Sequence, residues 1–301
     1  MAIKRLNDLL DVLRSHPKKR LVAAYANDSH TIGAVAQAVK AGIVEATLVG
    51  DEPTIKKVCG DLGVDVSQFA LVHEPVDVKA VAKAVQLINE GQGDVLMKGL
   101  VTTDKYMRGI LNKDCGLLPP KAVLSHVVVL EVPSYHKLLV LGDVAIIPAP
   151  DFKQKLAIVN YVVRAARTLG VEMPKVALLA ATEQMSVGMQ ACVDAALIAK
   201  MGERGQISGA VLDGPLALDV AIDKEAAEIK KLRSEVAGDA DCLVFPNIES
   251  GNIFFKTCTK FAGAQLGAMV VGAKVPCVLT SRGDSVQSKL YSIALAASSA
   301  K

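Results

Sequence analysis

The sequence has no tryptophan, and aromatic residues make up only 4% of its 301 residues. Proteins that bind single-stranded nucleic acid stack bases on aromatic rings, and here the net charge is only +3. Long apolar runs are also missing. The longest stretch without Lys, Arg, Asp or Glu covers residues 261–273, whereas a membrane span needs about 20 apolar residues. Nucleic-acid-binding and membrane-spanning proteins are therefore excluded, and a hydrophobic content of 51% excludes a disordered chain.

Several familiar signatures are absent as well. The six cysteines lie far apart, without C-x-x-C or zinc-finger spacing, which predicts buried reduced thiols and no metal site. The N-terminus has no apolar signal core, so we expect a cytoplasmic protein. There is no G-x-x-x-x-G-K-[ST], G-x-G-x-x-G, H-E-x-x-H or G-x-S-x-G, and no histidine pairs with Ser or Cys as in a catalytic triad. His126 lies in an apolar run and fits either the core, which we favour, or the wall of a cleft.

The chain is organised as two alternating sets of strands and helices. Residues 2–15 show the apolar spacing of an amphipathic helix. The βαβα alternation that follows predicts parallel sheets covered by helices on both faces. Residues 123–131 and 137–143 have no room for a helix between them and are interpreted as a β-hairpin. The stiff Pro148–Pro150 segment is interpreted as a domain junction. We therefore expect two α/β domains with a cleft between them, where ligands meet the carboxyl ends of strands.

Polar residues cluster where predicted strands end. Lys98, Thr102 and Thr103 follow one strand, with Arg108 on the next helix, and together they make a candidate anion site. A solvated Arg in an ordinary loop is the alternative reading of this segment.

Two further strand ends carry similar residues. One precedes the N-terminus of a predicted helix that carries Ser250, Asn252 and Lys256. These residues suit either phosphate binding or plain helix capping. The other continues into Ser281 and Arg282, a hydroxyl and a guanidinium suited to bidentate phosphate binding. The adjacent residues Asp284 and Ser285 are expected to cap the last helix, a reading compatible with phosphate binding.

A fourth strand end carries Asp219 and Asp223, one helical turn apart. They could ligate Mg²⁺, although a helix N-terminal charge pattern is the more common meaning of this spacing.

Taken in order, these segments resemble the phosphate acetyl/butyryltransferase family, most clearly from about Leu96 to Ala297. The resemblance is carried by seven segments: Met97-Lys-Gly-Leu-Val-Thr-Thr, Leu124-Ser-His-Val, Lys175-Val-Ala-Leu-Leu-Ala, Gly209-Ala-Val-Leu-Asp-Gly-Pro-Leu-Ala-Leu-Asp, Val236-Ala-Gly-Asp-Ala-Asp, Ser250-Gly-Asn-Ile and Thr280-Ser-Arg-Gly-Asp-Ser.

The resemblance implies reversible acyl transfer: acyl-CoA plus phosphate gives acyl phosphate plus CoA. Coenzyme A is then a substrate, and no prosthetic group is implied. It further implies a two-domain, three-layer α/β/α sandwich like that of isocitrate and isopropylmalate dehydrogenases, with an interdomain cleft, and a homodimer. The C-terminal segment would complete the first domain, giving residues 1–148 plus 276–301 and residues 149–275, with hinges near Pro148–Pro150 and Lys274–Pro276.

The family also implies roles for site residues. Ser281 and Arg282 match the pair at the CoA/acyl-phosphate site, and Arg108 matches an Arg that holds phosphate. Ser288 occupies the position of the carboxylate assigned as thiol base in the acetyltransferases, a departure shared with butyryl-type members. A second departure is Gly116-Leu-Leu-Pro-Pro, where many butyryl-type members have Gly-Leu-Arg-Thr-Gly.

These observations predict direct attack of the CoA thiolate on the acyl-phosphate carbonyl, with Asp284 as candidate substitute base and capping as its alternative role. Three alternatives stay open: an acetyl-specific enzyme, a metal- and NAD-dependent decarboxylating dehydrogenase of the same fold using Asp219 and Asp223, and a non-catalytic binding protein.

Overall fold

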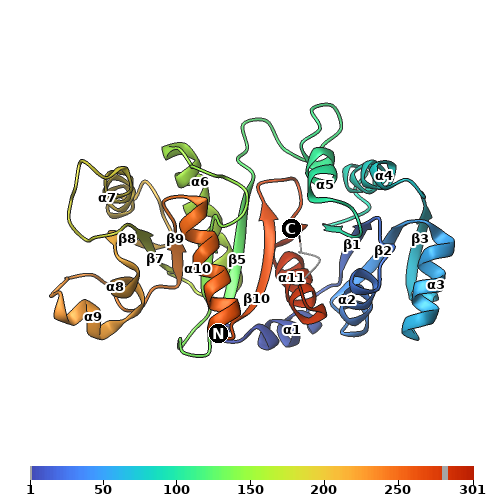
Figure 1. Ribbon diagram of the computed structural model, residues 1–301, viewed down its shortest axis with the longest axis horizontal. Coiled ribbons are helices and arrows are strands. Elements are labelled where there is room, and N and C mark those ends of the chain that lie inside the picture. Colours follow the sequence, from blue (N-terminus) through green and yellow to red (C-terminus); the bar gives the residue numbers. More distant parts are fainter. Residues whose placement is uncertain (1, 280–283) are drawn as a thin grey trace. The chain divides into compact units, whose positions relative to one another are not determined.

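The computed structural model describes residues 2–279 and 284–301 (Figure 1). Its contacts divide the chain into two compact units. The middle unit comprises Ser125–Gln265 with the N-terminal residues up to Arg5, and the flanking unit comprises Leu6–Leu124 and Leu266–Lys301. The breaks thus fall at residues 124/125 and 265/266, whereas the sequence suggested hinges near 148–150 and 274–276. The hairpin accounts for the first difference, because its second strand pairs with a strand of the middle unit.

The sheet of the flanking unit is mostly parallel, as the alternating pattern predicts. The neighbours β3, β2, β1, β4 and β11 run parallel in that order, and β10 pairs antiparallel with β11. Because β1, β4 and β11 are adjacent and parallel, their carboxyl ends meet at one edge of the sheet. The strands are β1 (Lys19–Ala24), β2 (Val44–Gly50), β3 (Phe69–His73), β4 (Val95–Lys98), β10 (Gln265–Val271) and β11 (Cys277–Val278).

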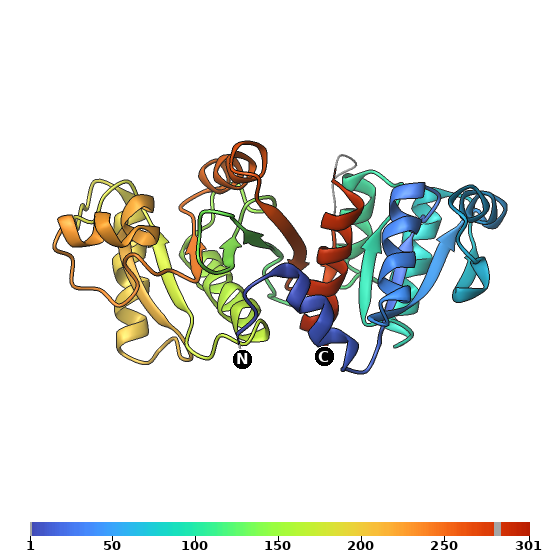
Figure 2. The same cartoon turned by 90° about the horizontal axis from the view of Figure 1, so that it is seen from below.

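Helices of the flanking unit begin and end at residues whose chemistry favours those positions. The Asp28 carboxylate accepts a hydrogen bond from the Thr31 amide (2.9 Å) at the start of α2, and Gly63 in the left-handed region ends α3. α1 buries Leu6, Leu9, Leu10 and Leu13, as its spacing predicts, and α11 packs beside α1 and α2 (Figure 2). The helices are α1 (Leu6–Arg14), α2 (Ser29–Lys40), α3 (Glu52–Leu62), α4 (Asp77–Asn89), α5 (Thr103–Ile110) and α11 (Val286–Ser299), with a 3₁₀ turn at Val66–Gln68.

The middle unit begins with the expected hairpin, in which Val127 lies opposite Gly142 in an antiparallel pair. Beyond it the strands are parallel in the order β6, β9, β7, β8. Its strands are β5 (Ser125–Glu131), β6 (Leu139–Gly142), β7 (Lys175–Leu179), β8 (Val211–Leu216) and β9 (Cys242–Val244), and its helices are α6 (Phe152–Thr168), α7 (Gln190–Glu203), α8 (Leu218–Ile222), α9 (Lys224–Ile229) and α10 (Ile248–Phe261).

Burial confirms most expectations about the scattered thiols and His126. Five of the six cysteines are buried and all six are free thiols, but Cys115 is exposed. His126 is buried, as the core reading requires. In the described part of the chain, no helix is both long and apolar enough to cross a bilayer.

Candidate functional site

Lys98 ends β4 at the polar edge of the flanking unit. Its side chain is buried, and its ammonium donates to the carbonyl oxygens of Gly99 (3.2 Å) and Val101 (2.9 Å). A Cβ at Gly99 would overlap the carbonyl oxygen of Tyr25, which follows β1. The neighbouring loops therefore pack backbone against backbone, and Lys98 places a buried positive charge beneath them.

The two threonines of this strand end lie at the start of α5. The Thr102 hydroxyl caps the helix by accepting a long hydrogen bond from the Lys105 amide (3.4 Å), and Thr103 is the first residue of α5. Arg108 follows on the same helix with a side chain that is 80% exposed. Its guanidinium donates to Asp104 (3.1 Å), a surface pair weak enough for a phosphate to displace.

The end of β11 leads into the segment that carries Ser281 and Arg282, which lie outside the described residues. Asp284 was expected to cap α11 together with Ser285. The structure assigns the cap to Ser285 alone, whose hydroxyl accepts from the Ser288 amide at 3.1 Å. The Ser288 hydroxyl lies 3.1 Å from that of Ser285. The Asp284 carboxylate is thus not the cap of α11.

Sequence reasoning missed Lys289, the next residue of α11. It is buried, and burial lowers the pKa of its ammonium against the opposing effects of Asp284 and Asp28. One oxygen of Asp28 caps α2, while the other is buried without a hydrogen-bond partner among the described residues. A lysine immediately before the apolar run 290–297 is the sequence signal that could have marked it.

In the middle unit, the start of α10 fits plain capping, one of the two readings of this segment. The cap is Asn247, whose side chain accepts from the Ser250 amide (3.0 Å), and the Ile248 amide donates to Pro148. The Ser250 hydroxyl donates to Asn247, and the Asn252 amide nitrogen donates to the carbonyl oxygen of Val144 (2.9 Å). Lys256 is exposed and lies about two turns into α10, not on the first turn.

The proposed magnesium ligands are occupied by other interactions. The Asp223 carboxylate caps α9 through the Glu225 amide (2.9 Å), and Asp219 lies 3.6 Å from the ammonium of Lys230. Among the described residues, no three or more His, Cys, Asp or Glu side chains lie together in a way that could hold a metal ion. The reading of the two carboxylates as a helix N-terminal charge pattern is therefore confirmed, with Asp219 in the first turn of α8 and Asp223 at the start of α9.

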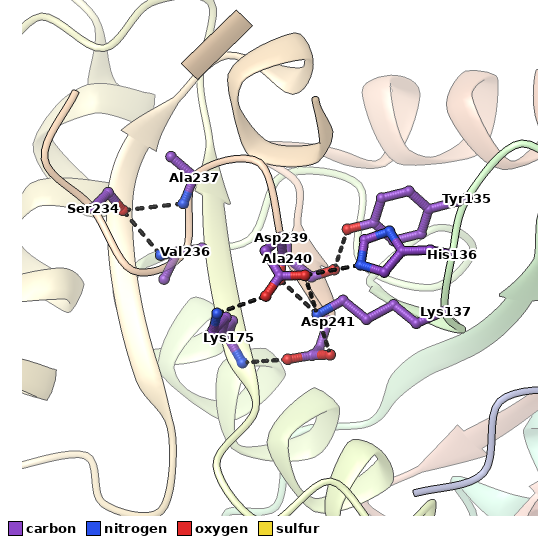
Figure 3. Close-up of polar contacts among 10 residues, drawn as sticks. All are labelled: Tyr135, His136, Lys137, Lys175, Ser234, Val236, Ala237, Asp239, Ala240 and Asp241. Carbon is purple, nitrogen blue, oxygen red and sulfur yellow. Dashed lines mark hydrogen bonds and ion pairs between the residues drawn. The ribbon is translucent and has the colours of Figure 1, made fainter. Parts of the chain in front are cut away.

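The Val236–Asp241 motif holds the hairpin in place (Figure 3). The Asp239 carboxylate contacts Lys175 (2.6 Å), Lys137 (2.9 Å) and His136 (2.9 Å). Burial alone would raise the pKa of Asp239, but hydrogen bonds from Lys175, Lys137 and His136 outweigh it and hold that pKa well below its usual range. Asp241 accepts from the Lys175 amide and pairs with Lys137 (2.8 Å each).

This cluster adjoins a hollow of about 890 Å³. The residues of the cluster come just before or at the start of β6, β7 and β9. The cluster therefore lies at the amino ends of these strands, opposite the edge where α/β proteins bind ligands. The carboxylates of the motif are already paired with lysines. We therefore assign it a structural role, one that the order of residues along the chain did not reveal.

Comparison with known proteins places these segments in context. Residues 64–297 match the family described as phosphate acetyl/butaryl transferase. A phosphate butyryltransferase of Clostridium acetobutylicum is 45% identical over 98% of both chains. A phosphate acetyltransferase of Thermotoga maritima is 38% identical over 97% of this chain and 98% of the relative.

Among solved structures, a branched-chain phosphotransacylase from Enterococcus faecalis V583 superposes with a TM-score of 0.81 at 30% identity, covering 93% of this chain and 98% of that one. All three of these proteins match more than nine-tenths of this chain, so the similarity extends across both units. The chain belongs to the phosphate acetyl/butaryl transferase family.

Proposed function

We propose that the protein transfers a short acyl group reversibly between coenzyme A and inorganic phosphate, with butyryl as the preferred chain. The observation that carries this proposal is the 45% identity to a phosphate butyryltransferase over 98% of both chains. The placement of Lys98, Thr102 and Thr103 at one carboxyl edge of the flanking sheet supports it. CoA is a substrate in this reaction, and no prosthetic group takes part.

The proposed chemistry is a single displacement in a ternary complex. The CoA thiolate attacks the acyl-phosphate carbonyl carbon, a C–S bond forms, and the C–O bond to phosphate breaks with phosphate as the leaving group. Arg108 and Arg282 neutralise the phosphate, and the Ser281 hydroxyl donates to the developing oxyanion. The thiol proton passes to a base, for which Asp284 is the candidate because it is the carboxylate nearest in sequence to Ser281 and Arg282.

The remaining assignments follow the family. Ser250, Asn252, Lys256 and Ser288 are proposed substrate-binding residues, and the protein is proposed to act as a homodimer in the cytoplasm. We further propose a three-layer sandwich like that of the isocitrate and isopropylmalate dehydrogenases. Ser288 in place of a carboxylate favours the butyryl branch, while the 38% identical acetyltransferase keeps acetyl-CoA as the second candidate.

The test follows free thiol after mixing protein, acyl-CoA and phosphate. Phosphate-dependent thiol release with butyryl-CoA, faster than with acetyl-CoA, is the expected result. Because Cys115 is exposed and would react with the colour reagent, Cys115→Ser is the appropriate background. No release with acetyl-, butyryl- or branched acyl-CoA would overturn the proposal, and faster release with acetyl-CoA would overturn the chain-length assignment.

A further inference from the structure

Asp143 is a buried carboxylate at the carboxyl end of β6 that the proposed chemistry does not use. Its residue is only 3% exposed. One oxygen accepts hydrogen bonds from the Ser125 hydroxyl (2.9 Å) and the His126 amide (3.1 Å), and the other accepts from the amides of Ala145 (2.8 Å) and Ile146 (2.9 Å). Four hydrogen bonds to one carboxylate fix the backbone on both sides of it.

The hairpin register explains why these groups meet. Val127 of β5 lies opposite Gly142 of β6, so Ser125 and His126 at the start of β5 face the residue that follows β6. β6 also runs parallel to β9, with Gly142 beside Val244. Asp143 therefore lies at the edge where β9 leads into α10, the edge at which α/β sheets bind ligands.

The loop that Asp143 holds is the support for α10. The Asn252 amide nitrogen donates to the Val144 carbonyl oxygen, and the Ile248 amide donates to that of Pro148 (3.0 Å). Gly251 packs directly on this loop, because a Cβ there would lie 2.8 Å from the Asp143 carbonyl oxygen. A shift of the loop would therefore move the first turn of α10.

These contacts also orient Asn252. A carbonyl oxygen only accepts hydrogen bonds, so the atom of Asn252 that faces Val144 is its amide nitrogen. Its side-chain oxygen points away from Val144 as a positioned acceptor. Phosphate at neutral pH mainly accepts hydrogen bonds, whereas the amide N–H, amino and hydroxyl groups of CoA donate them. The chemistry of Asn252 thus fits the CoA thioester.

We propose that Asp143 is a positioning residue for acyl-CoA binding, acting through the Val144 loop to aim the Asn252 side-chain oxygen at a donor of the CoA moiety. This inference rests on the proposed function and assigns one of its two substrates to this part of the site.

The first test is Asp143→Asn. An asparagine there presents its NH₂ group on one of two sides. Toward the His126 amide it breaks the tie between Asp143 and β5, and toward the Ala145 and Ile146 amides it breaks the tie to the loop, so one of the two ties is lost in either orientation. We expect the KM for butyryl-CoA to rise between about 10-fold and 10²-fold, while the KM for phosphate stays within a factor of two to three of the wild type (order of magnitude). Asn252→Ala should raise the same constant, and Gly251→Ala should do so without removing a hydrogen-bonding side chain.

The matched control is Asp94→Asn. Asp94 accepts from the Arg20 amide (2.8 Å) and guanidinium (2.6 and 3.0 Å) just before β4, at the amino end of that strand. It should lower the melting temperature and leave both KM values unchanged. If Asp143→Asn behaves in the same way, Asp143 is merely structural and the inference is overturned. A rise in the phosphate KM alone would overturn it as well.

Two measurements keep the outcome decisive. Should Asp143→Asn fail to fold, Ser125→Ala removes one donor and should raise the butyryl-CoA KM to a smaller extent. Calorimetry of CoA binding provides a readout that does not depend on turnover. If the wild-type protein shows no phosphate-dependent thiol release, the proposed function is refuted. If the wild-type protein is active but the Asp143, Gly251 and Asn252 variants bind CoA as tightly as it does, only this inference is refuted.

Discussion

The ion pair between Lys155 of α6 and Asp194 of α7 gives the sharpest stability prediction. The ammonium lies 2.6 Å from the carboxylate, and each side chain is only 8% exposed. The second oxygen of Asp194 accepts a hydrogen bond from the side-chain amide nitrogen of Gln190 (2.8 Å). At this separation the attraction is about 6 kcal/mol with an effective dielectric constant of about 20, before the cost of removing both charges from water.

Removing one partner leaves the other charge buried and unpaired. Lys155→Met and Asp194→Leu should therefore each lower the free energy of unfolding by about 3–5 kcal/mol. The double variant removes both charges and should be at least as stable as either single variant, so the two effects are strongly non-additive. Urea unfolding followed by circular dichroism measures all four proteins, because the chain has no tryptophan for fluorescence.

The matched control is the Lys200–Glu203 pair of α7. Its charges are almost as close, at 2.7 Å, but its side chains are 53% and 68% exposed. Lys200→Met should change the free energy of unfolding by less than about 1 kcal/mol. If Lys155→Met lowers the free energy of unfolding by no more than Lys200→Met does, burial does not govern the strength of the Lys155–Asp194 pair and the reasoning is refuted.

Three further outcomes are expected. Tyr106→Phe should lower the free energy of unfolding by about 1 kcal/mol, because the buried hydroxyl donates to the carbonyl oxygens of Leu96 (3.1 Å) and Val278 (3.4 Å). An unchanged midpoint of urea unfolding would contradict this. The pKa of Asp239 is depressed in the folded state, so its stabilisation is complete above the ordinary carboxyl pKa of about 4 and is lost as pH falls through the lower folded value. Asp239→Asn should thus lose less stability than the wild type on acidification from pH 6 to pH 2 (approximate range), and parallel profiles would refute the assignment. A thiol reagent should label Cys115 rapidly in the native protein and all six cysteines in urea, and rapid native labelling of Cys115→Ser would contradict the burial pattern.

Local patterns were enough to predict the fold class and many element positions. Apolar spacing over residues 2–15 predicts α1 because a helix must present one face to the core, and Leu6, Leu9, Leu10 and Leu13 are indeed buried. The short spacer between two β-branched runs predicts the hairpin because no crossover helix fits there, and β5 and β6 pair antiparallel.

Local patterns failed where several residues competed for one role. Asp284 and Ser285 could each cap α11, and only the backbone geometry shows that Ser285 does so. At α10 the sequence left phosphate binding and plain capping both open, and the structure shows that the Asn247 side chain caps the helix through the Ser250 amide. A cap depends on one residue having extended dihedral angles, and sequence identity alone leaves that choice between neighbours open.

The sequence by itself determined what lies along the chain: the alternation of strands and helices, the polar strand end at Lys98, and the motifs that mark the family. Only the tertiary structure decided which distant groups meet. Ser125 and Asp143 are joined by the register of a hairpin, and Lys155 and Asp194 by the packing of α6 and α7 on neighbouring strands of one sheet. Contacts of this kind depend on strand order and helix packing, which are set by burial summed over the whole chain and leave no local periodicity to read.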